Sequence, residues 1–117
     1  MLMGEIATKL GLKNLTPEIA AASKAEVKTG HSSDLLSDVL ANAPGGSVLV
    51  TIQVHVNVIA VAVHAGLAAV VFASGMMPEE RVRQKALEEG LPLYSAGEPT
   101  FDIVGKLYTL GLRGQGS

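Results

Sequence analysis

Hydrophobic and polar positions follow two periods along the 117-residue chain, and the two alternate from one segment to the next. Apolar residues three and four apart over 34–43 are typical of a helix, and strict alternation over 25–29 is typical of a strand that residues 30–33 end. The continuous apolar runs 47–52 and 67–73 predict strands covered on both faces. In chain order the prediction is helix 3–10, an irregular or edge-strand segment 13–22, strand 25–29, helix 34–43, strand 47–52, helix 57–65, strand 67–73, helix 78–89, strand 92–95 and helix 100–110.

Glycine, proline and small polar residues mark the expected ends of these elements. Gly66 and Gly90 follow the last turns of two helices, where glycine readily adopts the left-handed conformation. Ser33 or Asp34 is the expected N-cap of the helix that follows, because a side-chain oxygen there can accept an otherwise unpaired amide. Pro78 is expected at the first position of its helix.

The spacing of apolar side chains also predicts which helix faces turn inward. Helix 57–65 is apolar nearly all round, so we expect it to be buried on two sides. Charged residues of the next helix are expected to form a solvated face, comprising Arg81, Arg83, Lys85, Glu88 and Glu89. The inward face of the last helix is expected to hold Phe101, Val104, Leu107 and Tyr108.

Strand and helix alternate four times with short connections, which is the pattern of a parallel sheet with helices on both faces. We therefore predict a three-layer, flavodoxin-like α/β fold with a parallel sheet of about four to five strands. A chain of this length fits one domain, which we place at 1–112, with a flexible tail at 113–117.

The composition excludes several classes of protein. Nine Lys and Arg against eleven Asp and Glu give a net charge of −2 without a concentrated basic face, so no nucleic-acid partner is expected. The chain has no cysteine, which excludes disulfides and thiolate chemistry and fits a reducing, cytoplasmic compartment. The weakly polar run 54–73 is interrupted by polar residues such as His55 and Asn57, so it predicts core rather than a membrane span.

No segment has the pattern of a catalytic or cofactor site. The one Gly-Lys pair, Gly105-Lys106, lies inside a predicted helix and is followed by Leu107 rather than a hydroxyl residue, so it is not a phosphate loop. No Gly-x-Gly-x-x-Gly follows a strand, and no serine lies in Gly-x-Ser-x-Gly. We therefore predict no catalytic residues and no cofactor.

Polar residues cluster where the predicted strands end. The carboxyl ends of parallel strands and the starts of the following helices share one edge of a sheet, where exposed amides suit an anion or a small polar ligand. His31 and His55 each follow a predicted strand and could reach this edge, but the histidines include no adjacent ligand pair, so no metal is predicted. The predicted ligand-binding residues are Gly30, His31, Ser32, Ser33, Thr51, Gln53, His55, Asn57, Ser74, Gly75 and Ser95.

Short motifs that follow one another along the chain carry a family resemblance: Thr29-Gly30, Ser33 to Val39, Val50 to Gln53, Asn57 to Ala62, Gly90 to Ser95 and Gly105 to Tyr108. Together they resemble the DRTGG domain family, which includes small relatives of the N-terminal part of HPr kinase/phosphorylase. The resemblance runs through about residues 25–110 and implies a compact α/β domain that accompanies catalytic or nucleotide-sensing modules and helps them associate. The turn at 53–57 departs from the family, because Gln-Val-His-Val-Asn stands where an acidic-basic pair is expected.

Two functions remain open at this point. The first is a non-catalytic regulatory or small-ligand-binding domain that forms a homodimer and takes a small anionic or nucleotide ligand. The second is a small enzyme acting on a phosphorylated or acidic metabolite, with His55 as general acid/base and Thr51 or Ser74 orienting the substrate. The family resemblance and the apolar helix 57–65 favour the first.

Overall fold

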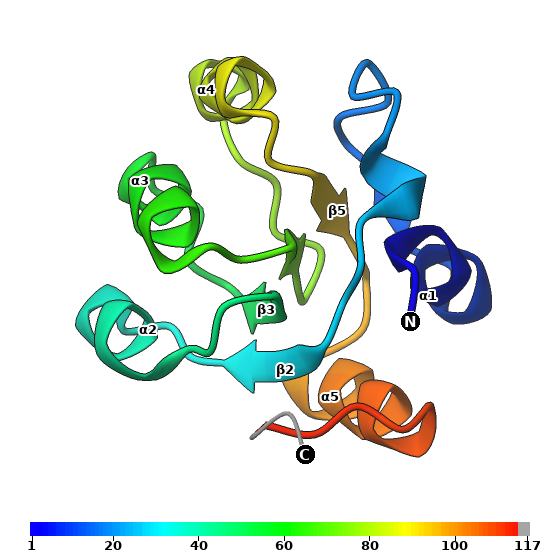
Figure 1. Cartoon of the computed structure of the whole chain (residues 1–117). Coiled ribbons are helices and arrows are strands. Elements are labelled where there is room, and N and C mark those ends of the chain that lie inside the picture. Colours follow the sequence, from blue (N-terminus) through cyan, green and yellow to red (C-terminus); the bar gives the residue numbers. More distant parts are fainter. Residues whose placement is uncertain (115–117) are drawn as a thin grey trace.

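The computed structural model describes residues 1–114 and places one sheet between two layers of helices (Figure 1). The strands are β1 (Lys13–Asn14), β2 (Thr29–Ser32), β3 (Ser47–Thr51), β4 (Ala69–Phe72) and β5 (Leu93–Ser95). The helices are α1 (Met3–Leu10), α2 (Leu36–Asn42), α3 (Asn57–Ala65), α4 (Glu80–Glu89) and α5 (Thr100–Thr109), with a short 3-10 helix, η1, at Ala22–Lys24. Each predicted helix and strand therefore has a counterpart, although several boundaries differ.

The sheet has the strand order β1-β5-β4-β3-β2, in which β2 to β5 are parallel and only the short edge strand β1 is antiparallel. Because successive parallel strands are neighbours, their right-handed connections place α2, α3 and α4 on one face, and α1 and α5 cover the other (Figure 1). This confirms the prediction of a three-layer α/β fold, with a sheet that is parallel except at β1. The order of the four parallel strands never reverses, so the described residues form no crevice of the kind found where strand order switches.

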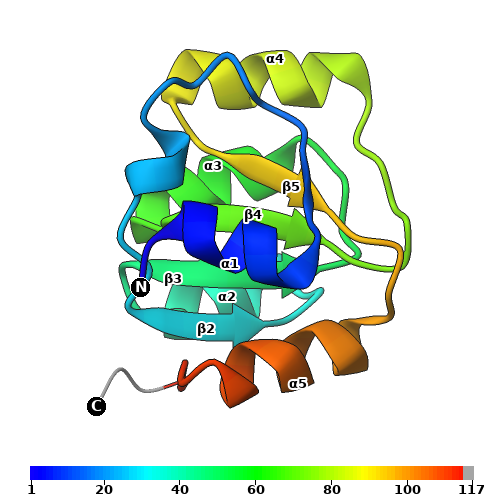
Figure 2. The same ribbon diagram turned by 90° about the vertical axis from the view of Figure 1, so that its right-hand side faces the viewer.

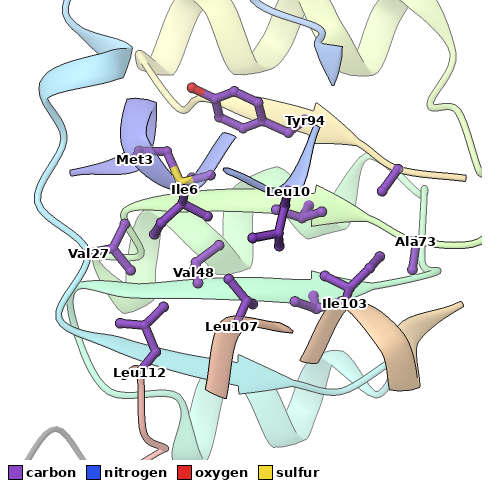
Figure 3. Close-up of a cluster of buried hydrophobic side chains, with 14 residues drawn as sticks. Met3, Ile6, Leu10, Val27, Val48, Ala73, Tyr94, Ile103, Leu107 and Leu112 are labelled. Atoms are coloured by element: carbon purple, nitrogen blue, oxygen red, sulfur yellow. The ribbon is translucent and has the colours of Figure 1, made fainter. Parts of the chain in front are cut away.

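Alternate residues of the central strands belong to two separate cores. In β3, Val48 and Val50 face α1 and α5, whereas Leu49 faces the three-helix layer. Neighbouring strands share this alternation, and Tyr94 of β5 is the largest side chain buried in the α1 and α5 core (Figure 3). A continuous apolar strand sequence is required because both faces are covered.

Strand β2 begins four residues later than predicted. Its pairing with β3 begins at Thr29, opposite Ser47, and continues through Ser32, opposite Val50. Residues 30–32 therefore extend the strand instead of ending it. The preceding segment contacts the N-terminus instead, where the backbone amide of Val27 donates to the carbonyl of Met1 (2.8 Å).

Two predicted helix starts are also wrong. Helix α2 begins at Leu36 and has no side-chain cap, because Asp34 uses its carboxylate to bind the end of β3 and the Ser33 hydroxyl accepts only the amide of Leu35. Helix α4 begins at Glu80, two residues after Pro78, so the proline belongs to the preceding loop.

The inward face of α5 also differs from the prediction. Ile103 and Leu107 are the buried residues of α5, whereas Phe101 and Tyr108 point to solvent. Helix α3 packs on the sheet between α2 and α4, and this position accounts for its apolar sides without a second protein chain (Figure 1).

The end of the described chain follows the open edge of the sheet. The carbonyl of Arg113 accepts the amide of Gly30 in β2 (3.0 Å), and the Arg113 guanidinium stacks on the Tyr108 ring at 3.7 Å from its centre. The rest of the predicted tail, 115–117, lies outside the described residues. Among residues 1–114, none of the helices has the length and apolar content needed to cross a membrane.

Candidate functional site

The carboxyl ends of the four parallel strands lie along one edge of the sheet, at the arrowheads of β2 to β5 in Figure 2. Thr51 ends β3, Ser95 ends β5, and Ser74 and Gly75 lie just beyond β4. Gln53 and His55 occupy the loop between β3 and α3. The predicted site residues therefore reach this edge from all four parallel strands. Gly30 and His31 are the exceptions, because they lie inside β2 and not at its carboxyl end.

Asp34 joins the ends of β2 and β3. Its Oδ1 atom accepts the Thr51 hydroxyl (2.9 Å) and the Ile52 amide (2.9 Å), and the Thr51 oxygen in turn accepts the Gln53 amide (3.1 Å). Thr51 is fully buried, so its hydroxyl is held within the protein and does not reach a ligand. The Asp34 carboxylate therefore already binds the hydroxyl and amide donors at the end of β3, where the sequence suggested an anionic ligand.

The loop that follows is held by its own side chains. The side-chain Oε1 atom of Gln53 accepts the His55 amide (3.3 Å), and the Nδ1 atom of His55 accepts the Asn57 amide (3.1 Å). An Nδ1 atom that accepts a hydrogen bond places the proton of the neutral ring on Nε2. His55 therefore presents an N–H donor at its exposed end, and Gln53 keeps its NH₂ group as a second donor.

The turn after β4 cannot offer the amides that the sequence suggested. Ser74 and Gly75 both adopt positive φ, and their amides donate to the carbonyls of Glu98 (2.7 Å) and Ala96 (2.8 Å). Ser95 is buried at the end of β5, directly before the segment that this turn contacts. These residues fix the turn, so any recognition at this edge depends on side-chain donors.

A pocket of about 380 Å³, which we call the rim pocket, opens between the β3–α3 loop and the start of α4. The lining residues are Gln53, Val54, His55, Val56, Met77, Glu79, Arg81 and Val82. Of the predicted site residues, only Gln53 and His55 line it. The pocket thus combines an apolar wall with three kinds of N–H donor, from an amide, an imidazole and a guanidinium.

Arg81 and Glu79 are the charged residues of the rim pocket that sequence reasoning missed. They form an exposed ion pair (3.1 Å), in which Arg81 donates through Nε. A pair of this kind contributes little to stability, so the guanidinium can rearrange toward an anion at small cost. Both residues follow β4 at the start of its helix, so extending the strand-end argument to the next helix start would have found them.

His31 does not line the rim pocket and contacts α2. Its Nε2 atom is 3.0 Å from Asp38 Oδ2, and Asn42, His31 and Ser33 hold the pKa of Asp38 below its ordinary value, Asn42 having the largest effect. His31 and Ser32 instead line a hollow of about 170 Å³ between β2 and α5. Within residues 1–114, His, Asp and Glu side chains nowhere gather in a group of three that could hold a metal ion.

We predict that Asp34→Ala will loosen the loop after β3. Removing the carboxylate leaves the Ile52 amide without its acceptor, so hydrogen exchange at Ile52 should accelerate by about tenfold, the equivalent of one charged hydrogen bond. Asp34→Asn keeps a side-chain oxygen and serves as the matched control. Unchanged exchange at Ile52 in the alanine variant would show that Asp34 does not organise this edge.

Comparisons with known proteins yield a structural neighbour. No family model matches the chain, and no curated protein matches it in sequence. Among solved structures, it is similar to the CBS and DRTGG domains of the regulatory region of Clostridium perfringens pyrophosphatase, crystallised with the activator diadenosine tetraphosphate. The TM-score is 0.67 at 7% sequence identity, and the match covers 89% of this chain and 44% of that one.

At this level of identity the comparison shows a shared fold, and it agrees with the resemblance that the sequence motifs carried. The chain spans less than half of the neighbour's length, so the match is to part of a larger regulatory region. The molecule thus shares its α/β fold with part of that CBS and DRTGG regulatory region.

Proposed function

We propose that this chain is a non-catalytic regulatory domain that binds a small anionic ligand, with nucleotides as the leading class, in the rim pocket. The observation that carries the proposal is the convergence of Gln53, His55 and Arg81 on one pocket beside apolar side chains. Apolar walls suit a planar base, and the donors suit phosphate oxygens. The fold shared with a regulatory region that was crystallised with a nucleotide activator supports the same class of ligand.

Calorimetric titration with pyrophosphate, ATP and diadenosine tetraphosphate tests this proposal. We expect at least one of these probes to bind, and His55→Ala and Arg81→Ala each to weaken its binding by roughly tenfold or more, the equivalent of a hydrogen bond to a charged group. Lys24→Ala, at the exposed end of η1, is the control and should bind normally. Binding that both rim variants retain in full would contradict the assignment of the pocket.

The second part of the proposal is that the domain self-associates. Large exposed apolar side chains on α5 support it, because Phe101 and Tyr108 turn away from the core that their own helix covers. Light scattering coupled to size exclusion should therefore report about twice the chain mass of 12.1 kDa at high protein concentration. A single monomeric mass across the whole accessible concentration range would contradict self-association and leave the ligand site untouched.

A further inference from the structure

Glu79 brings a negative charge into the rim pocket, directly beside the pocket's cation. Of the residues that line the pocket, Glu79 is the acidic one and Arg81 the basic one. The Oε2 atom of Glu79 accepts a hydrogen bond from Nε of Arg81 (3.1 Å). His55 is uncharged in the state that accepts the Asn57 amide, because a protonated ring has no acceptor. The lining of the pocket therefore has no net charge.

Helix formation does not explain the Glu79 carboxylate. Glu79 occupies the N-cap position of α4, yet its side chain accepts no helix amide. Its backbone carbonyl begins the helix instead, by accepting the amides of Val82 (2.9 Å) and Arg83 (3.2 Å). Serine, threonine, aspartate and asparagine are the residues that cap a helix well. The Glu79 side chain is 76% exposed, so its charge is available to act on Arg81 and on a ligand.

The next glutamate along the chain has a different partner. Glu80 pairs with Arg83 (2.9 Å) and does not line the rim pocket. Arg81 and Arg83 are two residues apart in α4 and so lie on different sides of the helix. Helix α4 lies beside α3 (Figure 1), and Arg81 is on the side that borders the loop before α3. A ligand in the pocket therefore meets Glu79 and not Glu80.

An anion that binds Arg81 must compete with Glu79. A guanidinium binds carboxylate or phosphate oxygens best through two parallel N–H groups, and the Nε group of Arg81 already donates to Glu79. Two negative charges at one guanidinium also repel each other. Arg81 is 64% exposed and the pair is weak, so an anion can displace the carboxylate, but at a cost in affinity.

We propose that Glu79 is a built-in counter-ion of the rim pocket, which pairs with Arg81 until an anionic ligand takes its place. The proposal rests on the proposed function, because it concerns the ligand of the same pocket. Glu79 thus sets the response of the pocket to charge. It lowers the affinity for anions and leaves the affinity for uncharged molecules unchanged.

Calorimetric titration of Glu79→Gln with pyrophosphate and with ATP tests the proposal. Glutamine keeps the length of the side chain and removes its charge, so both affinities should rise by about threefold to fivefold, the range of one exposed ion pair. Adenosine has no charge, and its affinity should not rise. Glu80→Gln is the matched control, because it removes the same charge one residue away and outside the pocket, and it should leave the affinities unchanged.

A double variant tests whether Glu79 acts through Arg81. In an Arg81→Ala background no ion pair remains to be broken, so Glu79→Gln should raise the affinity for pyrophosphate by less than it does in the wild type. An equal rise in both backgrounds would mean that Glu79 only adds charge to the surface, and would overturn the counter-ion role. Thermal denaturation should show the same melting temperature for Glu79→Gln and the wild type, because the pair is exposed.

The outcomes separate the counter-ion role from the ligand site. Probes that bind the wild type and Glu79→Gln equally well would overturn the counter-ion role and leave the site in place. An equal gain for Glu80→Gln, or for adenosine, would also overturn it. Binding that becomes measurable only in Glu79→Gln would support both the role and the site. If neither pyrophosphate nor ATP binds the wild type or Glu79→Gln, both are contradicted.

Discussion

Replacing Ile103 with alanine should lower the free energy of unfolding by about 2–5 kcal/mol, the usual loss for a large side chain removed from a packed core. Ile103 is fully buried where α5 meets the sheet, next to Leu107 and within the cluster shown in Figure 3. Phe101→Ala removes a larger side chain two residues away, yet it should change the free energy of unfolding by less than about 0.5 kcal/mol because the ring is exposed.

Denaturant unfolding at a low protein concentration, where dimerisation does not contribute, would measure both changes. The comparison tests the orientation of α5 directly, because side-chain size alone would predict the larger loss for phenylalanine. A larger loss for Phe101→Ala than for Ile103→Ala would mean that the helix presents the opposite face to the sheet.

Gly4→Ala should destabilise the domain by about 1–2 kcal/mol although alanine is the better helix former. Gly4 lies on the side of α1 that packs against η1, where a Cβ atom would stand 2.8 Å from Ser23 Cβ and 2.9 Å from the Ser23 carbonyl oxygen. One of these contacts involves backbone, so a side-chain rotation cannot relieve it and the two elements must separate.

The matched control for this substitution is Gly105→Ala, which makes the same chemical change in a helix where nothing resists it. Thermal denaturation of both variants, again at a concentration where the protein is monomeric, should show a lower melting temperature only for Gly4→Ala. Equal or higher stability of Gly4→Ala would show that α1 and η1 are not packed as closely as described.

The order of the elements could be predicted because it depends on local sequence. Hydrophobic period distinguishes strands such as 69–72 from helices such as 80–89, and Gly90 adopts the left-handed conformation expected of a helix end. The alternation of short strands and helices then leaves few arrangements other than a mostly parallel sheet with helices on both faces.

The orientation of α5 could not be predicted because this helix carries two apolar stripes. Ile103 and Leu107 form one, and Phe101, Val104 and Tyr108 form the other. Either stripe satisfies the helical period, and only the shape of the sheet decides which one is buried. The sequence prediction mixed the two stripes, so it was right for Leu107 and wrong for Phe101 and Tyr108.

Long-range pairing accounts for the other differences. The start of β2 is set by its register with Ser47, and Asp34 acts on Thr51 instead of capping its own helix. Arg83, expected on a solvated face, is largely covered because it donates to the Leu15 carbonyl (3.3 Å) and to Glu18 (2.8 Å). Each of these partners is distant in sequence, so no local pattern indicates it.

The candidate site was predicted in part for the same reason. Strand ends located Gln53 and His55 at the carboxyl edge of the sheet, but the availability of the amides around Ser74 depended on carbonyls at 96 and 98. The rim pocket also needs Met77 and Arg81, which reach the His55 loop only because β3 and β4 are neighbours. The position of polar groups along an edge is thus readable from sequence, whereas their hydrogen-bond partners require the fold.

The most direct test of the ligand site is a nuclear magnetic resonance titration of the isotope-labelled protein with pyrophosphate, ATP and diadenosine tetraphosphate. We expect amide shift changes that saturate with at least one probe and cluster at Gln53, His55 and Arg81 around the rim pocket. Changes clustered at Gly45 and Gly90, near the opposite ends of the strands, would contradict the proposed site. Spectra unchanged by all three probes would contradict binding of this class of ligand.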